Sequence, residues 1–320
     1  MFKSSFQLSR FLVISFFLPF IGVGQSDVIE IPDFGKNKGN LTMYLHVNNT
    51  IKTKKLPLVV VLHGCSQNAQ KVAEQSGWNK LADQYGFIVL YPEQKRANNM
   101  SNCFNWFNKK DIDPNNGESS SILEMIAFTK ANYAIDSTRI FIYGLSAGAA
   151  MTVNLMANSP TTFNTGASFA GGAYGIAQTF LSASSAMSNP PAKSPEEWAD
   201  LVPRSDTYPR LIVGHGTKDN VVDFQNAQEL IKQWTYLHQL DFKDGIPEPS
   251  FAQNKRITRT SYRDSLMNER VIFYELKNAG HALPVDPGDG NEQGGETGMF
   301  AEDYDFFSTY YVAKDFGLLD

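Results

Sequence analysis

Continuous apolar runs alternate with amphipathic stretches along much of this chain. Residues 56–62 read Leu-Pro-Leu-Val-Val-Val-Leu, an unbroken apolar run that is typical of a strand buried on both faces of a parallel sheet. Residues 119–132 carry apolar side chains at helical spacing, and residues 224–238 form a second amphipathic helix pattern. This alternation of strands and helices predicts a mainly parallel sheet that is covered by helices on both faces.

Other segments extend the same alternation. Residues 27–49 predict an early hairpin, and residues 68–85 predict one helix. We expect the strand at residues 87–91 to end at Pro92. Residues 173–208 are rich in Ser, Ala and Pro and predict a helical insertion over the sheet. Further strands are expected over 139–143, 167–169, 211–213 and 271–276, and further helices over 147–158 and 302–316.

Residues 140–150 hold the most informative motif of the chain. An apolar β-forming run leads into Gly-Leu-Ser-Ala-Gly at residues 144–148, and small helix-forming residues follow. Between a strand and a helix, Gly-x-Ser-x-Gly indicates a nucleophile elbow, in which the serine hydroxyl is exposed at the tip of a strained turn. A tight buried turn is the alternative. Together with the alternating elements, the motif favours an α/β-hydrolase fold with Ser146 as the nucleophile.

A serine nucleophile needs a base and an acid that orients the base. In this fold the acid follows a strand after the elbow, and the histidine comes last. Asp219 follows the strand at 211–213, whereas Asp223 is placed to cap the next helix, so we expect Asp219 to be the acid. His281 follows the strand at 271–276 and is the expected base. The other histidines lie in the early hairpin, at strand ends or at a helix end: His46, His63, His215 and His238.

The oxyanion that develops during acyl transfer needs two backbone donors. We expect one to be the amide of Ala147, directly after the nucleophile, and the other to be the amide of Cys65, in the loop after the first buried strand. In the resulting mechanism Ser146 attacks an ester carbonyl while His281 takes its proton. Asp219 holds the imidazole, and water later hydrolyses the acyl-enzyme.

Composition and charge indicate the compartment and exclude some partners. The chain has 320 residues and a net charge of -5, which fits one large domain and argues against a nucleic-acid surface. Residues 1–24 are typical of a secretory signal, with Lys3 and Arg10 before an apolar run, residues 11–23, that serine, proline and glycine interrupt. An uncleaved membrane anchor is the alternative. We expect a secreted protein, extracellular or periplasmic, whose catalytic domain is residues 25–320 and which has no stable membrane association after cleavage.

The two cysteines of the chain are Cys65 and Cys103. In an exported protein such a pair is most simply a disulfide, and two separate buried thiols are the alternative. Closing a loop of this length would stabilise the fold by roughly 4 kcal/mol in the chain-entropy description. The bond would also fix the loop of the expected oxyanion donor and draw Trp106 towards the cleft.

Motifs spread from about residue 40 to the C-terminus carry a family resemblance. They are His63-Gly64-Cys65-Ser66-Gln67, Trp78, Tyr91-Pro92-Glu93-Gln94, Cys103-Phe104-Asn105-Trp106-Phe107, Gly144-Leu145-Ser146-Ala147-Gly148, Val285-Asp286-Pro287-Gly288 and Tyr310-Tyr311-Val312-Ala313-Lys314. Together they resemble the esterase/poly(3-hydroxybutyrate) depolymerase family, which is close to the feruloyl and acetylxylan esterases of carbohydrate esterase family 1. The resemblance implies an α/β-hydrolase fold, carboxylic-ester hydrolysis, the triad Ser146, Asp219 and His281, and a Cys65–Cys103 disulfide.

The resemblance leaves two kinds of ester substrate open. We favour removal of feruloyl or acetyl groups from plant polysaccharide, and the alternative is depolymerisation of poly(3-hydroxybutyrate) or a related polyester. The chain shows no separate substrate-binding module of the kind that many polyester depolymerases carry. The residues after His281, Ala282 and Leu283, depart from the family pattern and leave the acyl specificity open. Trp106 and Gln67 are expected to contact the substrate, although Trp106 could equally belong to the core with its aromatic neighbours, Phe104 and Phe107.

Other classes of function have less support from the sequence. A serine peptidase uses the same triad, but nothing suggests a propeller or a peptide-specificity domain. A non-catalytic binding protein of this fold would be expected to lack a triad member, and all three are present. No cofactor or metal is expected, because the spacing of three carboxylates in a glycine-rich loop does not match a calcium site. These carboxylates are Asp286, Asp289 and Glu292.

Overall fold

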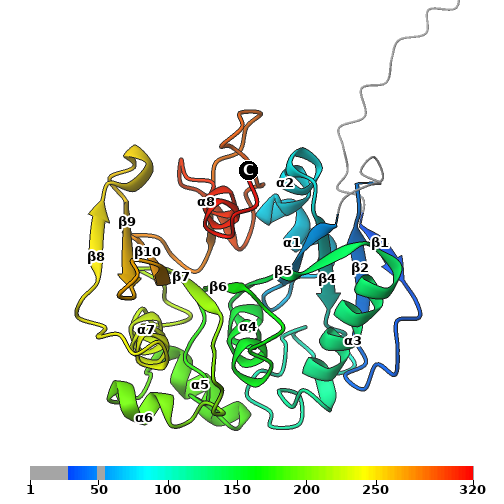
Figure 1. Ribbon diagram of the computed structural model, residues 1–320, viewed down its shortest axis with the longest axis horizontal. Coiled ribbons are helices and arrows are strands. Elements are labelled where there is room, and N and C mark those ends of the chain that lie inside the picture. The colour runs from blue at the N-terminus through cyan, green and yellow to red at the C-terminus, as the bar shows by residue number, and fades with distance from the viewer. Residues whose placement is uncertain (1–27, 49–54, 320) are drawn as a thin grey trace, which may run out of the picture.

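Ten strands among the described residues, 28–48 and 55–319, form one sheet in this computed structural model (Figure 1). In order across the sheet they are β1 (Ile29–Ile31), β2 (Thr42–His46), β4 (Ile88–Glu93), β3 (Leu56–Leu62), β5 (Ile135–Leu145), β6 (Thr165–Phe169), β7 (Arg210–Gly216), β10 (Glu269–Leu276), β9 (Ile257–Arg263) and β8 (Ile246–Pro249). The strands from β4 to β10 run parallel, and antiparallel pairs form both edges. The predicted α/β fold class is confirmed, while the predicted signal, residues 1–24, lies outside the described residues.

The apolar run of β3 is buried along its whole length. Leu58 and Val60 belong to the core on one face of the sheet, and Val59 and Val61 belong to the core on the other. Because successive side chains of a strand point to opposite faces, a strand covered on both sides is apolar at every position. Fully burying one such side chain contributes about 1.5–3 kcal/mol, so the composition of β3 favours its place inside the sheet.

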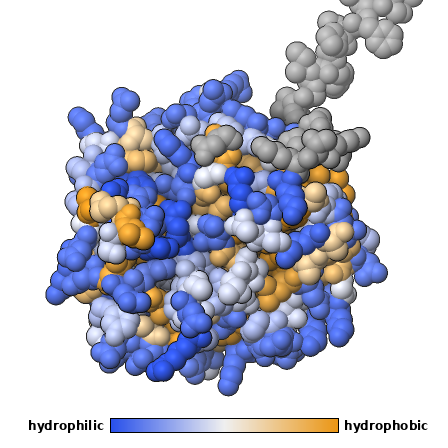
Figure 2. Space-filling model, viewed as in Figure 1, coloured by the Kyte–Doolittle hydropathy of each residue, from blue (hydrophilic) through white to orange (hydrophobic). Residues whose placement is uncertain are grey.

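Helices cover both faces of the sheet, as Figure 1 shows. One face packs against α3 (Gly117–Asn132), α4 (Ala147–Asn158) and α7 (Gln225–Leu237). The opposite face packs against α1 (Ala69–Ser76), α2 (Trp78–Tyr85) and α8 (Ser308–Asp315). Among the described residues, none of the helices combines the length and the apolar character that a membrane crossing needs. On the face drawn in Figure 2, hydrophobic patches are small and lie between hydrophilic side chains.

The structure differs from the prediction at two element boundaries, one at Gly77 and one at Pro92. The single helix predicted over residues 68–85 is wrong, because Gly77 divides it into α1 and α2. Gly77 has a left-handed φ of 68°, and its amide closes α1 by donating to the carbonyl of Ala73. Conversely, β4 continues through Pro92. The last pairing of β4 with β3 is at Leu90, so the missing N–H of the proline interrupts no ladder on that side.

The C-terminal third contains strands that the sequence pattern did not predict. The closing helix predicted over residues 302–316 begins only at Ser308, because β12 (Ala301–Asp303) first pairs with β11 (Leu283–Val285). The sequence pattern also did not predict the edge strand β8 and its neighbour β9. Every residue of β8 is exposed, and most side chains of β9 are polar, so neither strand has the apolar pattern of the central sheet.

The insertion predicted over residues 173–208 contains two short helices, α5 (Phe180–Ser188) and α6 (Pro195–Ala199), each with a capping box at its N-terminus. Trp198 of α6 is fully buried, and its indole N–H donates to Glu229 of α7 at 2.6 Å. Figure 1 shows both helices on the same side of the sheet as α7. The insertion is therefore fastened to the body of the domain through α7.

Replacing Gly77 by alanine is expected to destabilise the protein more than the same change at Gly317. The two glycines have φ values of 68° and 69°, so either alanine adopts a left-handed backbone that is unfavourable by about 1–2 kcal/mol. At Gly77 the added Cβ would also lie 2.8 Å from the amide of Gly295 and from the ring of Phe307, whereas nothing lies within 4 Å at Gly317. Urea unfolding should show an extra loss of about 1–3 kcal/mol for Gly77→Ala. Equal losses at both positions would contradict the packing argument.

Candidate active site

Ser146 lies in the turn between β5 and α4, where the backbone is strained. Its φ of 55° is left-handed, and its amide donates to the carbonyl of Phe169 at 2.8 Å. A Cβ on Gly144 would collide with the carbonyl of Gly148, and a Cβ on Gly148 would collide with the carbonyl of Leu62. Only glycine permits so close an approach of backbone to backbone, and it allows α4 to start directly after the serine.

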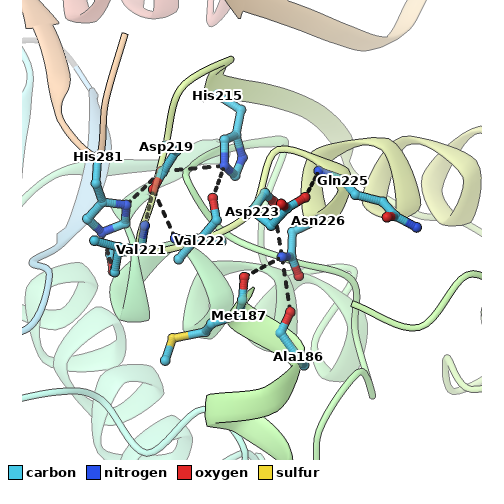
Figure 3. A network of polar contacts seen from close by, with 11 residues as sticks. Ala186, Met187, His215, Asp219, Val221, Val222, Asp223, Gln225, Asn226 and His281 are labelled. Carbon is cyan, nitrogen blue, oxygen red and sulfur yellow. Dashed lines mark hydrogen bonds and ion pairs between the residues drawn. The ribbon is translucent and has the colours of Figure 1, made fainter. Parts of the chain in front are cut away.

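The turn brings the hydroxyl of Ser146 to the imidazole of His281. Ser146 Oγ lies 2.9 Å from His281 Nε2. On the other side of the ring, His281 Nδ1 lies 2.7 Å from Asp219 Oδ2, as Figure 3 shows. Because a carboxylate only accepts hydrogen bonds, Nδ1 carries the proton and Nε2 accepts from the hydroxyl. The three side chains follow β5, β7 and β10, at the carboxyl edge of the sheet. This is the order of contacts that a nucleophile, a base and an orienting acid need.

The carboxylate of Asp219 is buried and held by more than the histidine. Its Oδ1 accepts hydrogen bonds from the amides of Val221 and Val222, both at 2.9 Å. Burial alone would raise the pKa of Asp219, but the interaction with His281 and the two amides lower it below its usual value. Asp219 therefore stays ionised, as a partner of an imidazolium must.

Asp223, the alternative acid, is used at the start of α7 instead. Its carboxylate accepts from the amide of Gln225 at 2.8 Å, and its own amide donates to the carbonyl of Met187 at 2.7 Å. Asn226 adds hydrogen bonds to the carbonyls of Ala186 and Met187, both at 3.1 Å (Figure 3). The start of α7 thus binds the end of α5, and so joins the insertion to the loop that carries the acid.

His215 lies buried beside Asp219, at the end of β7. Its Nε2 lies 2.8 Å from the carbonyl of Val222 and 3.5 Å from Asp219 Oδ2. Burial lowers the pKa of His215, so the ring is neutral at pH 7 and its Nε2–H donates to the carbonyl. The contacts of His215 support the loop of Asp219 without adding a second positive charge.

Cys65 and Cys103 form a disulfide that lines a pocket beside Ser146. The amide of Cys65 has no hydrogen-bond partner among the described residues. The amide of Ala147 is at the first position of α4, where a helix has no acceptor of its own for the N–H. Both expected oxyanion donors are therefore available next to the serine.

Gln67, which we expected to contact the substrate, is instead buried beneath the loop of Cys65. Its Oε1 accepts from the amide of Gly64 at 2.7 Å, and its Nε2 donates to Gln75 at 2.5 Å. Both polar ends are thus used inside the protein, and Gln67 is not part of the pocket wall. The sequence could not reveal this, because Gln75 reaches the loop only through the packing of α1.

The pocket beside Ser146 is mostly apolar, and the insertion forms much of its wall. Trp106 lines it together with Phe107, whereas Phe104 is fully buried in the core. Phe107 and Phe180 make an edge-to-face contact, with 6.0 Å between ring centroids. The sequence predicted an insertion over the sheet but not which of its residues line the pocket, because the insertion carries no chemical motif. The lining residues from the insertion are Ile176, Phe180, Ala183, Ser184 and Met187.

The glycine-rich loop that holds Asp286, Asp289 and Glu292 folds around a lysine. Lys80 Nζ donates to three backbone carbonyls of this loop at distances between 2.7 and 3.1 Å. Glu292 accepts from the hydroxyl of Tyr311 at 3.1 Å. Within the described residues, no group of three or more His, Cys, Asp or Glu side chains is arranged to hold a metal ion.

Comparisons with known proteins place the chain among ester hydrolases. The chain is 36% identical over 295 residues to poly(3-hydroxyalkanoate) depolymerase C of Paucimonas lemoignei, covering 91% of this chain and 70% of that protein. It is 31% identical over 287 residues to feruloyl esterase B of Talaromyces stipitatus, covering 86% of this chain and 77% of that protein.

Structural and family comparisons lead to the same group of proteins. The solved acetyl xylan esterase from Aspergillus awamori superposes with a TM-score of 0.71 at 25% identity, covering 80% of this chain and 94% of that one. A family model described as "Esterase PHB depolymerase" matches residues 41–247, which is more than half of the sequence. The chain therefore belongs to the esterase PHB depolymerase family.

Proposed function

We propose that this protein is a secreted serine ester hydrolase in which Ser146, His281 and Asp219 carry out acyl transfer. One observation carries the proposal. The imidazole of His281 is hydrogen-bonded both to Ser146 Oγ and to Asp219, and Ser146 lines a pocket. Membership of an esterase family supports carboxylic esters as the substrate. Export rests on the signal pattern of residues 1–24.

Acylation begins when Ser146 attacks the ester carbonyl and His281 Nε2 takes its proton. The amides of Cys65 and Ala147 stabilise the oxyanion, and one such donor lowers the barrier by on the order of 3 kcal/mol. Asp219 stabilises the imidazolium, which returns the proton to the departing alcohol. Water then attacks the acyl-enzyme with His281 as the base, and free acid leaves.

The shape and chemistry of the pocket favour an ester with a bulky apolar acyl group. Trp106, Phe107 and Phe180 present aromatic surface on which an aryl group can stack. An acetyl group is too small to reach most of this wall. We therefore propose feruloyl-type esters of plant polysaccharide as the substrate, and the relative named feruloyl esterase B supports the same choice.

A polyester of hydroxyalkanoic acids is the second candidate, because exposed apolar side chains flank the pocket. Phe180 and Leu181 are 69% and 81% exposed, and Met100, between two residues that line the pocket, is 90% exposed. Apolar groups exposed beside a binding pocket are typical of contact with an apolar partner. The relative named poly(3-hydroxyalkanoate) depolymerase C supports this candidate.

Ser146→Ala is expected to abolish covalent labelling by a fluorophosphonate probe, because the only nucleophile of the proposed mechanism is removed. Labelling can be followed by intact-protein mass spectrometry, with circular dichroism to show that the variant is folded. A wild-type protein that stays unlabelled would contradict the enzyme proposal and favour a binding protein of the same fold.

Asp219→Asn is expected to lower kcat for p-nitrophenyl butyrate by about 10³- to 10⁴-fold, because an amide can hold the imidazole in the wrong tautomer. Asp223→Asn is the matched control. Its side-chain oxygen can still accept from the amide of Gln225, so kcat should stay close to that of the wild type. An inactive Asp223→Asn with an active Asp219→Asn would reverse the assignment of the acid.

Methyl ferulate and a suspension of poly(3-hydroxybutyrate) separate the two candidate substrates. We expect release of ferulate, measured by chromatography, without clearing of the suspension. Clearing without release of ferulate would instead establish the polyester candidate. In that case Met100→Ser with Leu181→Ser should slow clearing but leave hydrolysis of p-nitrophenyl butyrate unchanged, because neither side chain lines the pocket.

A further inference from the structure

Glu118, in the first turn of α3, is a buried carboxyl that the proposed mechanism does not use. Only 1% of its surface is exposed. A buried carboxylate without partners is strongly unfavourable, so such a group is retained only where hydrogen bonds or opposite charge compensate it. Its contacts therefore show what the carboxyl holds in place.

Three hydrogen-bond donors converge on Glu118, and all three come from the segment 94–105. Asn105 donates its amide to Oε2 at 2.8 Å and its side-chain Nδ2 to Oε1 at 2.6 Å. Gln94 donates its Nε2 to Oε1 at 2.6 Å. The N-terminus of α3 also favours a negative charge at this position. These three hydrogen bonds favour the ionised carboxylate, whereas burial and the nearby charge of Asp111 raise its pKa and oppose ionisation.

The side chain of Gln94 connects Glu118 to the loop of the oxyanion donor. The amide of Gln94 donates to His63 Nε2 at 3.0 Å, and its Nε2 donates also to the carbonyl of Cys103 at 3.1 Å. His63 stands two residues before Cys65, and Cys103 is joined to Cys65 by the disulfide. Gln94 thus contacts both sides of the segment that presents the Cys65 amide.

Asn105 connects the same carboxylate to the wall of the pocket. Its side-chain oxygen accepts from Asn99 at 3.0 Å, and Asn99 lines the pocket. Trp106, the next residue, also lines the pocket, and its carbonyl accepts from Asn154 of α4 at 2.7 Å. The position of Asn105 therefore determines where this side of the pocket lies.

We propose that Glu118 is a positioning residue for the active site. Its carboxylate holds Gln94 and Asn105, and through them it fixes the amide of Cys65 and the Trp106 wall relative to Ser146. The proposal rests on the proposed function, because the Cys65 amide matters only if an oxyanion forms there. Without the carboxylate, Gln94 and Asn105 lose their shared acceptor. The loop that presents the Cys65 amide is then held less firmly.

Glu118→Gln tests this proposal because it keeps the size of the side chain but turns an N–H group towards donors. Burial raises the pKa of Glu118 to about 8, so assays at pH 9 keep the wild-type carboxyl ionised. We expect kcat/KM for p-nitrophenyl butyrate to fall about 10- to 100-fold, less than the loss of a whole oxyanion donor. The Ki of a trifluoromethyl ketone, whose adduct with Ser146 carries an oxyanion, should rise by a similar factor.

Glu124→Gln is the matched control on the same helix. Glu124 accepts from the amide of Asn37 at 2.7 Å and, among the described residues, makes no hydrogen bond to the segment 94–105, so this variant should keep the wild-type kcat/KM and Ki. Equal values for the two glutamine variants would overturn the role of Glu118. A lowered melting temperature with unchanged kcat/KM below the transition would also overturn it, since the residue would then be purely structural.

A second variant keeps the proposal testable if Glu118→Gln does not fold. Asn105→Ala removes the side-chain donor to Glu118 Oε1 and the acceptor for Asn99, while the backbone amide that donates to Oε2 remains. We expect the same parallel change in kcat/KM and Ki, and a variant with wild-type values would overturn the proposal. A wild-type protein that does not react with a fluorophosphonate would instead contradict the proposed function itself.

Discussion

The close approach of three backbones at the elbow is the constraint on which the rest of the site depends. Gly144 and Gly148 have no room for a Cβ, because β5, α4 and the end of β3 meet there without side chains between them. This contact places Ser146 in a left-handed conformation at the start of α4. It also brings the end of β3 beside the serine, because Gly148 packs on the carbonyls of Leu62 and His63. One packing constraint therefore positions both the nucleophile and the loop of the Cys65 amide.

The candidate triad could be predicted from the sequence because it depends on the order of the strands. In a parallel sheet every loop after a strand emerges at the same edge, so the order of strands is enough to gather residues that are remote in the chain. The apolar runs located these strands, and the structure brings Ser146, His281 and Asp219 together at that edge. The choice between Asp219 and Asp223 needed only the helix that follows, since an acid used at a helix start is not free to orient a base.

The features that the sequence did not predict depend on backbone conformation and on hydrogen-bond partners, neither of which apolar spacing records. The break at Gly77 follows from backbone conformation, since apolar spacing continues across it. Gln67 belongs to the supporting structure because Gln75 and the Gly64 amide occupy its polar ends. Glu118 lies just before the helix predicted over residues 119–132 and was given no role, and its importance appears when three donors from another loop surround it. Hydrogen-bonded pairs of this kind leave no periodic signal in the chain.

Chemistry and specificity occupy different parts of this molecule. The proposed reacting groups follow central strands, where close packing on both faces restricts their movement. The pocket wall instead comes from the insertion and from the disulfide-bonded loop, with Phe180 and Trp106 as its aromatic members. One apolar contact changes discrimination between substrates by about 1–3 kcal/mol, so a few substitutions in the wall are enough to select another acyl group. Relatives named for feruloyl esters and for polyhydroxyalkanoates are therefore compatible with one unchanged catalytic sheet.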